Sequence, residues 1–90
     1  DGPMRIVARR LGAPYTLAEV MIARFVLDQR NRNRTRRHLL VTDEEHPVGG
    51  QLMGSDPEDF GPAAQRLVEA GFDVIDINFG CPVKTAIGGC

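Results

Sequence analysis

One cysteine occupies a position in which its thiol could take part in chemistry. Cys81 follows Gly80 and precedes Pro82, directly after a stretch of β-branched and apolar residues that we expect to be a strand. Gly80 lets the backbone approach a ligand closely, and Pro82 favours an extended conformation for the residue before it. The pattern therefore predicts a thiol just past the C-terminal end of a strand, where α/β folds place their active sites.

Two polar residues interrupt that strand. Residues 73–79 are apolar enough to form a strand buried on both faces, as in a parallel sheet. Asp76 and Asn78 share one face of it, because successive side chains alternate between the two faces. A buried carboxylate or amide costs free energy unless it is paired, so we expect both side chains to be used at the end of this strand.

Polar side chains also lie toward the ends of two earlier stretches of strand composition. The first stretch carries Glu19, and the second carries Gln51 after two glycines that indicate close approach by another backbone or a ligand. The C-terminal ends of parallel strands share one edge of a sheet. We therefore expect Glu19, Gln51 and Asn78 to converge with Cys81, although a solvated strand end is an alternative for Glu19.

Helical patterns alternate with these strands. The expected strands are residues 15–21, 48–54 and 73–79, and the expected helices are residues 2–11, 21–29 and 57–70. Asp1 is expected to cap the first helix, and Gly71 to end the third. Ser55 and Glu58 form a capping-box pattern before the third helix, which residues 61–62 (Gly-Pro) are expected to divide. This alternation predicts right-handed βαβ units and a parallel sheet.

Composition excludes several classes of protein. The 90 residues carry a formal net charge of −1, which gives no argument for nucleic-acid or membrane binding by the chain as a whole. No apolar run is long enough to cross a bilayer, and the chain does not start with a signal-peptide pattern. Two cysteines do not make a secreted disulfide framework, so a reducing cytoplasm is expected. The chain begins within a helix and ends in a glycine-rich loop, so we interpret it as a fragment.

Arginines are concentrated in residues 30–37. Without aromatic residues between the charges, such a run more often forms a solvated face than a nucleic-acid site. Contact with the phosphates of a polynucleotide is the alternative interpretation.

Two strand-end motifs together resemble those of the tRNA-dihydrouridine synthase family. The family's Asn-x-Gly-Cys-Pro strand end is present here as residues 78–82, and its upstream Gln-Leu-x-Gly strand as residues 51–54. Residues 1–5 and 11–13 resemble the family's first helix, and residues 19–21 resemble its second strand end. The resemblance runs from end to end, and the two motifs in this order are specific.

The resemblance implies an α/β fold: a fragment of a (β/α)₈ TIM barrel, with about three βα units of parallel strands. Residues 1–90 would then be part of an FMN-binding catalytic domain that reduces particular uridines in tRNA to dihydrouridine, with NADPH reducing the FMN. It implies Cys81 as the proton donor, Gln51 as an FMN ligand, and Asn78 as a contact of the flavin or the target uracil. It also implies a cytoplasmic protein without metal or membrane, monomeric in its complete form.

Parts of the family pattern are missing from the sequence. The family's first strand, with its Pro-Met flavin contact, would lie before Asp1. The later flavin-binding residues, the phosphate site and the tRNA-binding domain would lie after Cys90. A barrel typically needs roughly 250 residues, so we do not expect this fragment to close one or to work alone.

The expected reaction agrees with the chemistry of these side chains. Reduction of a uracil 5,6-double bond needs a hydride at one carbon and a proton at its neighbour. An unperturbed thiol has a pKa of about 8.5, so Cys81 stays protonated near neutrality and can supply that proton. Asn78 can donate and accept, which suits a uracil edge or a flavin ring. A nucleophilic Cys81 would need a base, and neither His38 nor His46 is placed to serve.

Three other interpretations remain open at this point. A flavin barrel reductase similar to dihydroorotate dehydrogenase would act on a free pyrimidine instead of tRNA. A metal or disulfide site could use Cys81 and Cys90, although a single cysteine pair is a weak signal for zinc. The chain could also be a truncated product with no activity of its own.

Overall fold

The structure is a computed structural model that describes residues 1–28, 30 and 36–80. Its elements are α1 (Gly2–Arg10), β1 (Thr16–Ile22), α2 (Ala23–Leu27), the 3₁₀ helix η2 (Asp43–Glu45), β2 (Val48–Met53), α4 (Pro57–Ala70) and β3 (Val74–Ile77). The three strands form one parallel sheet in the order β1-β2-β3. The predicted α/β class with parallel strands is therefore confirmed, and the arrangement is consistent with a fragment of a (β/α)₈ barrel.

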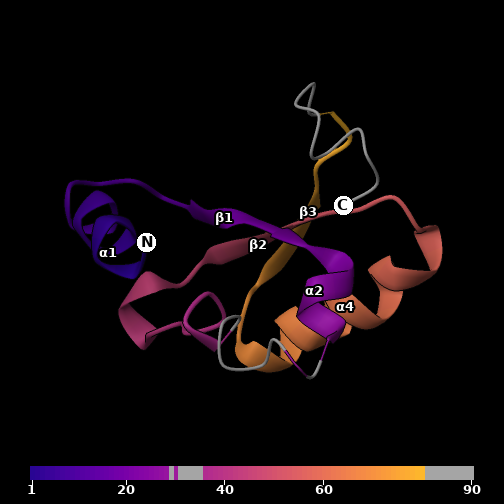
Figure 1. Ribbon diagram of the computed structural model, residues 1–90. Coiled ribbons are helices and arrows are strands. Elements are labelled where there is room, and N and C mark those ends of the chain that lie inside the picture. The colour runs from indigo at the N-terminus through magenta and orange to yellow at the C-terminus, as the bar shows by residue number, and fades with distance from the viewer. Residues whose placement is uncertain (29, 31–35, 81–90) are drawn as a thin grey trace.

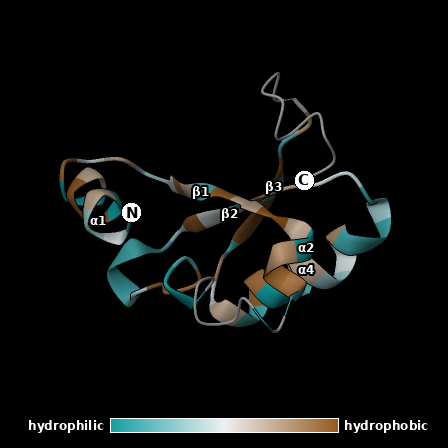
Figure 2. Ribbon diagram, in the orientation of Figure 1, coloured by the Kyte–Doolittle hydropathy of each residue, from teal (hydrophilic) through white to brown (hydrophobic). Residues whose placement is uncertain are grey.

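Two helices, α2 and α4, lie together on one side of the sheet, and α1 lies near the beginning of β1 (Figure 1). Val48 and Leu52 of β2 share a fully buried core with Ala63 and Leu67 of α4. Gly50 faces the same side, because a Cβ atom there would lie 2.9 Å from Leu67 Cδ1. Hydrophobic residues follow the strands and parts of α2 and α4 in Figure 2. Burial against these helices therefore decides which face of each strand is apolar.

The opposite face of the sheet is open in the part of the chain that the structure describes. Leu17, Val20 and Val74 are 39%, 43% and 48% exposed. The prediction that residues 73–79 form a strand buried on both faces is wrong for these residues, since β3 is shorter and alternates exposed with half-buried positions. The physical reason is that no element among the described residues covers the second face of the sheet.

Local signals place most helix ends correctly. Asp1 caps α1 as predicted, because its side chain accepts a hydrogen bond of 2.9 Å from the Met4 amide. Gly71 ends α4 as predicted, with a φ of 110° that favours glycine. The N-cap of α4 is Asp56, not Ser55, since the Asp56 carboxylate accepts a hydrogen bond of 3.0 Å from the Glu58 amide. The helix cap therefore lies one residue later than predicted.

The predicted division of this helix at residues 61–62 is wrong. α4 runs through Pro62 without a break. Pro62 removes one backbone donor, but the helix continues because Ala63 and Leu67, in the turns after it, are both fully buried in the core. The strand β1 also runs one residue further than expected, so the short helix α2 begins at Ala23 instead of Met21.

A buried ion pair fastens α1 to the segment before β2. Arg5 is 7% exposed and Glu45 is 1% exposed, and Arg5 Nε donates to Glu45 Oε1 at 2.7 Å. The Thr42 amide and hydroxyl donate to the second Glu45 oxygen at 2.6 and 3.0 Å. Burial raises the pKa of Glu45, but the hydrogen bonds from Thr42 and Arg5 outweigh burial, so the pKa lies below its usual value.

This ion pair predicts a pH-dependent stability. A carboxyl group with a lowered folded pKa stabilises the fold above its unfolded pKa of about 4.3, and that contribution disappears as the pH falls through the folded pKa. We expect Glu45→Gln in the full-length protein to lower the free energy of unfolding at pH 7 by about 2 kcal/mol. The difference from the wild type should shrink below about pH 4.

Denaturant unfolding between pH 7 and pH 3 measures this effect. Glu69→Gln, at an exposed position of α4, removes the same charge and should leave the pH profile unchanged. A difference between Glu45→Gln and the wild type that stays constant down to pH 3 would contradict the assignment.

No helix among the described residues is long and apolar enough to cross a membrane.

Candidate functional site

The open face of the sheet carries a pair of polar side chains brought together by strand register. Gln51 on β2 stands opposite Asp76 on β3 and beside Val20 on β1. Because Val48 and Leu52 face α4, the alternation of side chains places Gln51 on the other face. Gln51 Nε2 donates to Asp76 Oδ2 at 2.5 Å. The partner expected for Asp76 is therefore Gln51, on the neighbouring strand.

Asn78 joins this pair just after the end of β3. Its backbone amide donates to the Leu52 carbonyl at 2.8 Å, which continues the pairing of β3 with β2 beyond the last strand residue. Its side-chain Nδ2 donates to Gln51 Oε1 at 3.4 Å, and its Oδ1 accepts a hydrogen bond of 3.0 Å from the Gly80 amide. The part of the prediction that brings Gln51 and Asn78 together is therefore confirmed. Asn78 lies three residues before Cys81 in the sequence.

A hollow of about 430 Å³ adjoins this group. Its lining combines the ends of β2 and β3 with the beginning of α4: Gly54, Ser55, Pro57, Phe60, Ile77, Asn78 and Phe79. Phe79 lines the same hollow as Asn78 and is 94% exposed in the described part of the chain. An amide beside apolar and aromatic side chains can bind a planar heterocycle that has both carbonyl and N–H groups.

Two residues of interest lie outside the described residues: Cys81, the candidate proton donor, and Cys90. The roles suggested for Cys81 and for the Cys81–Cys90 pair remain predictions. Residues 31–35 of the arginine-rich run also lie outside the described part, while Arg30 forms an ion pair with Asp28 at 3.3 Å.

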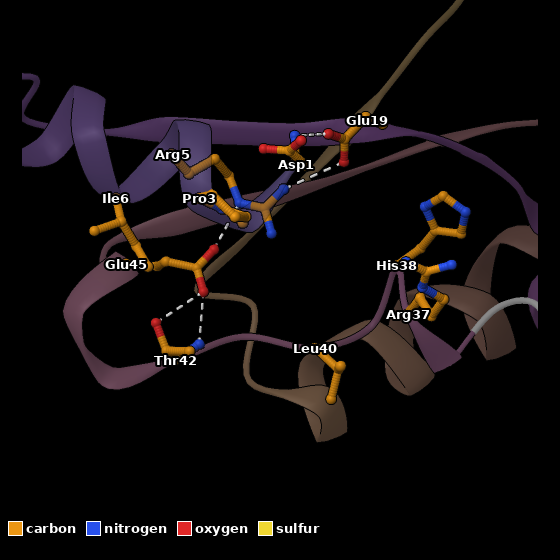
Figure 3. A pocket seen from close by; sticks show the side chains of 11 residues that line it. Asp1, Pro3, Arg5, Ile6, Glu19, Arg37, His38, Leu40, Thr42 and Glu45 are labelled. Atoms are coloured by element: carbon orange, nitrogen blue, oxygen red, sulfur yellow. Dashed lines mark hydrogen bonds and ion pairs between the residues drawn. The ribbon is translucent and has the colours of Figure 1, made fainter.

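The prediction that Glu19 joins Gln51 and Asn78 is wrong. Glu19 accepts hydrogen bonds from the terminal amine of Asp1 and, at 3.2 Å, from Arg5 Nη1 (Figure 3). The cause is an irregularity of β1 between Leu17 and Val20, which interrupts the regular alternation at Glu19.

A larger hollow, of about 610 Å³, surrounds this second group of charges (Figure 3). Arg5 and Glu45 line it with their charges already paired to each other, so the hollow offers a ligand no unpaired buried charge from these two residues. It lies beside α1 and η2, and Asn78, which lines the smaller hollow, does not line it. We therefore take the smaller hollow beside Asn78 as the candidate site.

His46 lies near the N-terminal ends of the strands, and Asn78 lies at their C-terminal ends. Its Nδ1 is 2.7 Å from Asp73 Oδ2, and the same oxygen accepts a hydrogen bond of 2.8 Å from the Val48 amide, at the beginning of β2. The contacts with His46 and Val48 lower the pKa of Asp73. Through Asp73, His46 therefore contacts the segment before β3 close to the start of β2, and it is remote from Asn78.

The comparisons with known proteins agree with the motifs of the sequence. The family model described as dihydrouridine synthase matches residues 1–90. The chain belongs to the dihydrouridine synthase family. The fold class expected from the resemblance and the family itself are thereby confirmed.

Curated relatives support the same assignment. Over 84 residues the chain is 40% identical to tRNA-dihydrouridine synthase B of Pseudomonas aeruginosa, a match that covers 93% of this chain and 25% of that protein. It is 36% identical to tRNA-dihydrouridine synthase B of Escherichia coli K12, over 93% of this chain and 26% of that protein. A probable tRNA-dihydrouridine synthase of Rickettsia prowazekii is 29% identical over 89 residues. The chain spans about a quarter of the length of these relatives.

In this member of the dihydrouridine synthase family, the sequence predicts that Asp76 is used at the end of its strand, but it gives Asp76 no specific role at the site. The structure places it at the end of the side-chain hydrogen bonds that join Gln51 and Asn78. The available signal was the spacing of Asp76 and Asn78, two residues apart and hence on one strand face. In the described part of the chain no group of three or more His, Cys, Asp or Glu residues could hold a metal ion.

Proposed function

We propose that this chain is part of a flavin-dependent tRNA-dihydrouridine synthase, which reduces a uridine of tRNA to 5,6-dihydrouridine with NADPH as the reductant. The observation that carries the proposal is the hydrogen bond between the Asn78 and Gln51 amides, in a chain of this family where Asn78 lies two residues before the Gly80-Cys81-Pro82 sequence. Residues 1–90 would form part of a longer catalytic barrel in a cytoplasmic protein. The names of the matched relatives support tRNA as the substrate.

The residues of the open face fit a flavin. Flavin and uracil rings both carry an imide edge, in which carbonyl groups flank an N–H group. Gln51 and Asn78 can each donate to a carbonyl oxygen and accept from an N–H group. Exposed Val20 and Val74 flank Gln51 and Asp76 and offer apolar surface to a planar ring. FMN bound at such a face would supply the hydride for the reduction.

Cys81 is proposed as the acid of the same reaction. The carbon next to the one that receives the hydride must be protonated, and a thiol that stays protonated at neutral pH can do this. Asn78 is two residues before Gly80 and holds its amide, so the backbone that leads to Cys81 starts from a fixed point. In this proposal Gln51 holds the cofactor, Asn78 contacts the cofactor or the uracil, and Cys81 donates the proton.

Substrate assays of the purified full-length protein test this function. We expect bound FMN, and we expect NADPH to be consumed when unmodified tRNA is added, with dihydrouridine formed in the tRNA. Free uracil and orotate serve as competing substrates in parallel assays. Reduction of either free pyrimidine without any reaction on tRNA would overturn the proposal in favour of a free-pyrimidine reductase.

The proposed role of Gln51 gives a prediction for cofactor retention. We expect Gln51→Ala in the full-length protein to raise the dissociation constant for FMN roughly tenfold, because a polar group of the flavin loses its hydrogen-bond partner. The measurement is fluorescence titration of the flavin-free protein with FMN. Gln65→Ala removes the same side chain from an exposed position of α4 and should bind FMN like the wild type. Equal affinity of the two variants would leave Gln51 with a structural role alone.

A further inference from the structure

Four residues at the end of β3 and on β2 form one continuous series of hydrogen bonds. The Gly80 amide donates to Asn78 Oδ1 at 3.0 Å, Asn78 Nδ2 donates to Gln51 Oε1 at 3.4 Å, and Gln51 Nε2 donates to Asp76 Oδ2 at 2.5 Å. The middle contact is the longest and therefore the weakest of the three. Asn78 and Gln51 each accept one hydrogen bond through the side-chain oxygen and donate one through the side-chain nitrogen.

The two ends of this series fix its direction. A backbone amide can only donate, and an ionised carboxylate can only accept. The two amide side chains between them can each be turned by 180°, which exchanges their oxygen and nitrogen. With Gly80 donating at one end and Asp76 accepting at the other, one arrangement of Asn78 and Gln51 satisfies all three contacts. Turning either amide places two donors or two acceptors against each other.

Strand register puts Asp76 in the position to do this. Gln51 and Asp76 are directly opposite each other in the parallel pairing of β2 with β3. Asp76 is exposed on the open face of the sheet, and it does not contribute to the buried core. Its hydrogen bond to Gln51 is therefore separable from the packing that holds the sheet together.

We propose that Asp76 is a positioning residue, which fixes the orientation of the Gln51 and Asn78 amides and, through them, the backbone at Gly80. Each amide then retains one N–H and one lone pair in a defined place for the imide edge of a ligand. The inference rests on the proposed function for the identity of that ligand, but the orientation of the amides is independent of it. The residue after Gly80 is Cys81, so the same series anchors the chain that leads to the proposed acid.

The test uses the full-length protein without flavin, so that the geometry is measured apart from the activity. Asp76→Ala removes the acceptor. Asp76→Asn keeps the shape of the side chain and one accepting oxygen, but its NH₂ group could also donate to Gln51, which reverses the direction of this hydrogen bond. The readouts are the side-chain amide resonances of Gln51 and Asn78 and the hydrogen exchange of the Gly80 amide. We expect Asp76→Ala to shift both side-chain resonances and to speed Gly80 exchange roughly tenfold, with Asp76→Asn intermediate. Glu69→Gln is the matched control on α4 and should match the wild type.

Two further measurements separate this inference from the proposed function. In FMN titration and in tRNA reduction we expect Asp76→Ala to weaken FMN binding and lower kcat, with Asp76→Asn partly restoring both. Altered amides and faster Gly80 exchange in a protein that binds no FMN would support the positioning role and reject the proposed function. Unchanged resonances and exchange in both Asp76 variants would overturn the positioning role, whatever happens to flavin binding or activity.

Discussion

Replacement of Cys81 by alanine is expected to separate the two halves of the proposed reaction. In the full-length protein we expect Cys81→Ala to bind FMN and to accept hydride from NADPH at nearly the wild-type rate. Reduction of unmodified tRNA by the reduced variant should slow by ~10²–10⁴, because no acid protonates the uracil as the hydride arrives. The prediction depends on the place of Cys81 in the sequence, between Pro82 and Gly80, whose amide donates to Asn78 Oδ1.

Stopped-flow absorbance of the flavin measures each half on its own. The first experiment mixes NADPH with the oxidised protein, and the second mixes unmodified tRNA with the reduced protein. Cys90→Ala removes the other thiol of the chain and should react like the wild type in both. If Cys81→Ala is reoxidised by tRNA at the wild-type rate, the proton comes from another group. If Cys90→Ala also loses both flavin reduction by NADPH and flavin reoxidation by tRNA, a site that uses the two cysteines together would be favoured.

The second large effect is expected at Gly50, where β2 meets α4. A Cβ atom at this position would lie 2.9 Å from Leu67 Cδ1 and 3.1 Å from Phe72 Cγ. Leu67 and Phe72 are both buried, so neither can move aside without disturbing the core. We expect Gly50→Val in the full-length protein to lower the free energy of unfolding by about 3 kcal/mol, at the upper end of what overpacking usually costs.

Gly61 provides the comparison for that substitution. It lies on α4, and a Cβ atom there would meet nothing within 4 Å outside its own neighbourhood. Gly61→Ala is expected to change the free energy of unfolding by less than about 1 kcal/mol. Denaturant unfolding of both variants at pH 7 is the measurement. A Gly50→Val protein as stable as Gly61→Ala would show that β2 and α4 separate readily and that this contact does not hold the layers together.

The order and type of the elements could be predicted because their signals are local. Asp1 and Gly71 set helix ends through capping and a positive φ, which depend on neighbouring residues alone. The alternation of strands and helices then leads to a parallel sheet. The continuity of α4 through Pro62 could not be predicted in this way, because it depends on burial of Ala63 and Leu67 against a strand distant in the sequence.

The candidate site could be predicted only in part, because local patterns identify polar residues within strands but do not give the register between strands. Gln51 and Asn78 stood out because each is polar within an apolar or glycine-rich strand. Asp76 faces Gln51 because of the register of β2 with β3. No local sequence pattern predicts that register. Glu19 was placed at the wrong site because its contact, Arg5, comes from a helix whose packing is decided by tertiary structure.

The irregularity of β1 has a consequence for aligning this chain with relatives of different length. Leu17 pairs with Gly49 and Val20 with Gln51, so two residues of β1, Ala18 and Glu19, stand against Gly50 alone. Removing one of these two residues would keep Val20 on the open face and Met21 buried. Such a deletion removes the extra residue and leaves the pairing on both sides of it unchanged. A one-residue gap in this strand therefore belongs at Ala18 or Glu19.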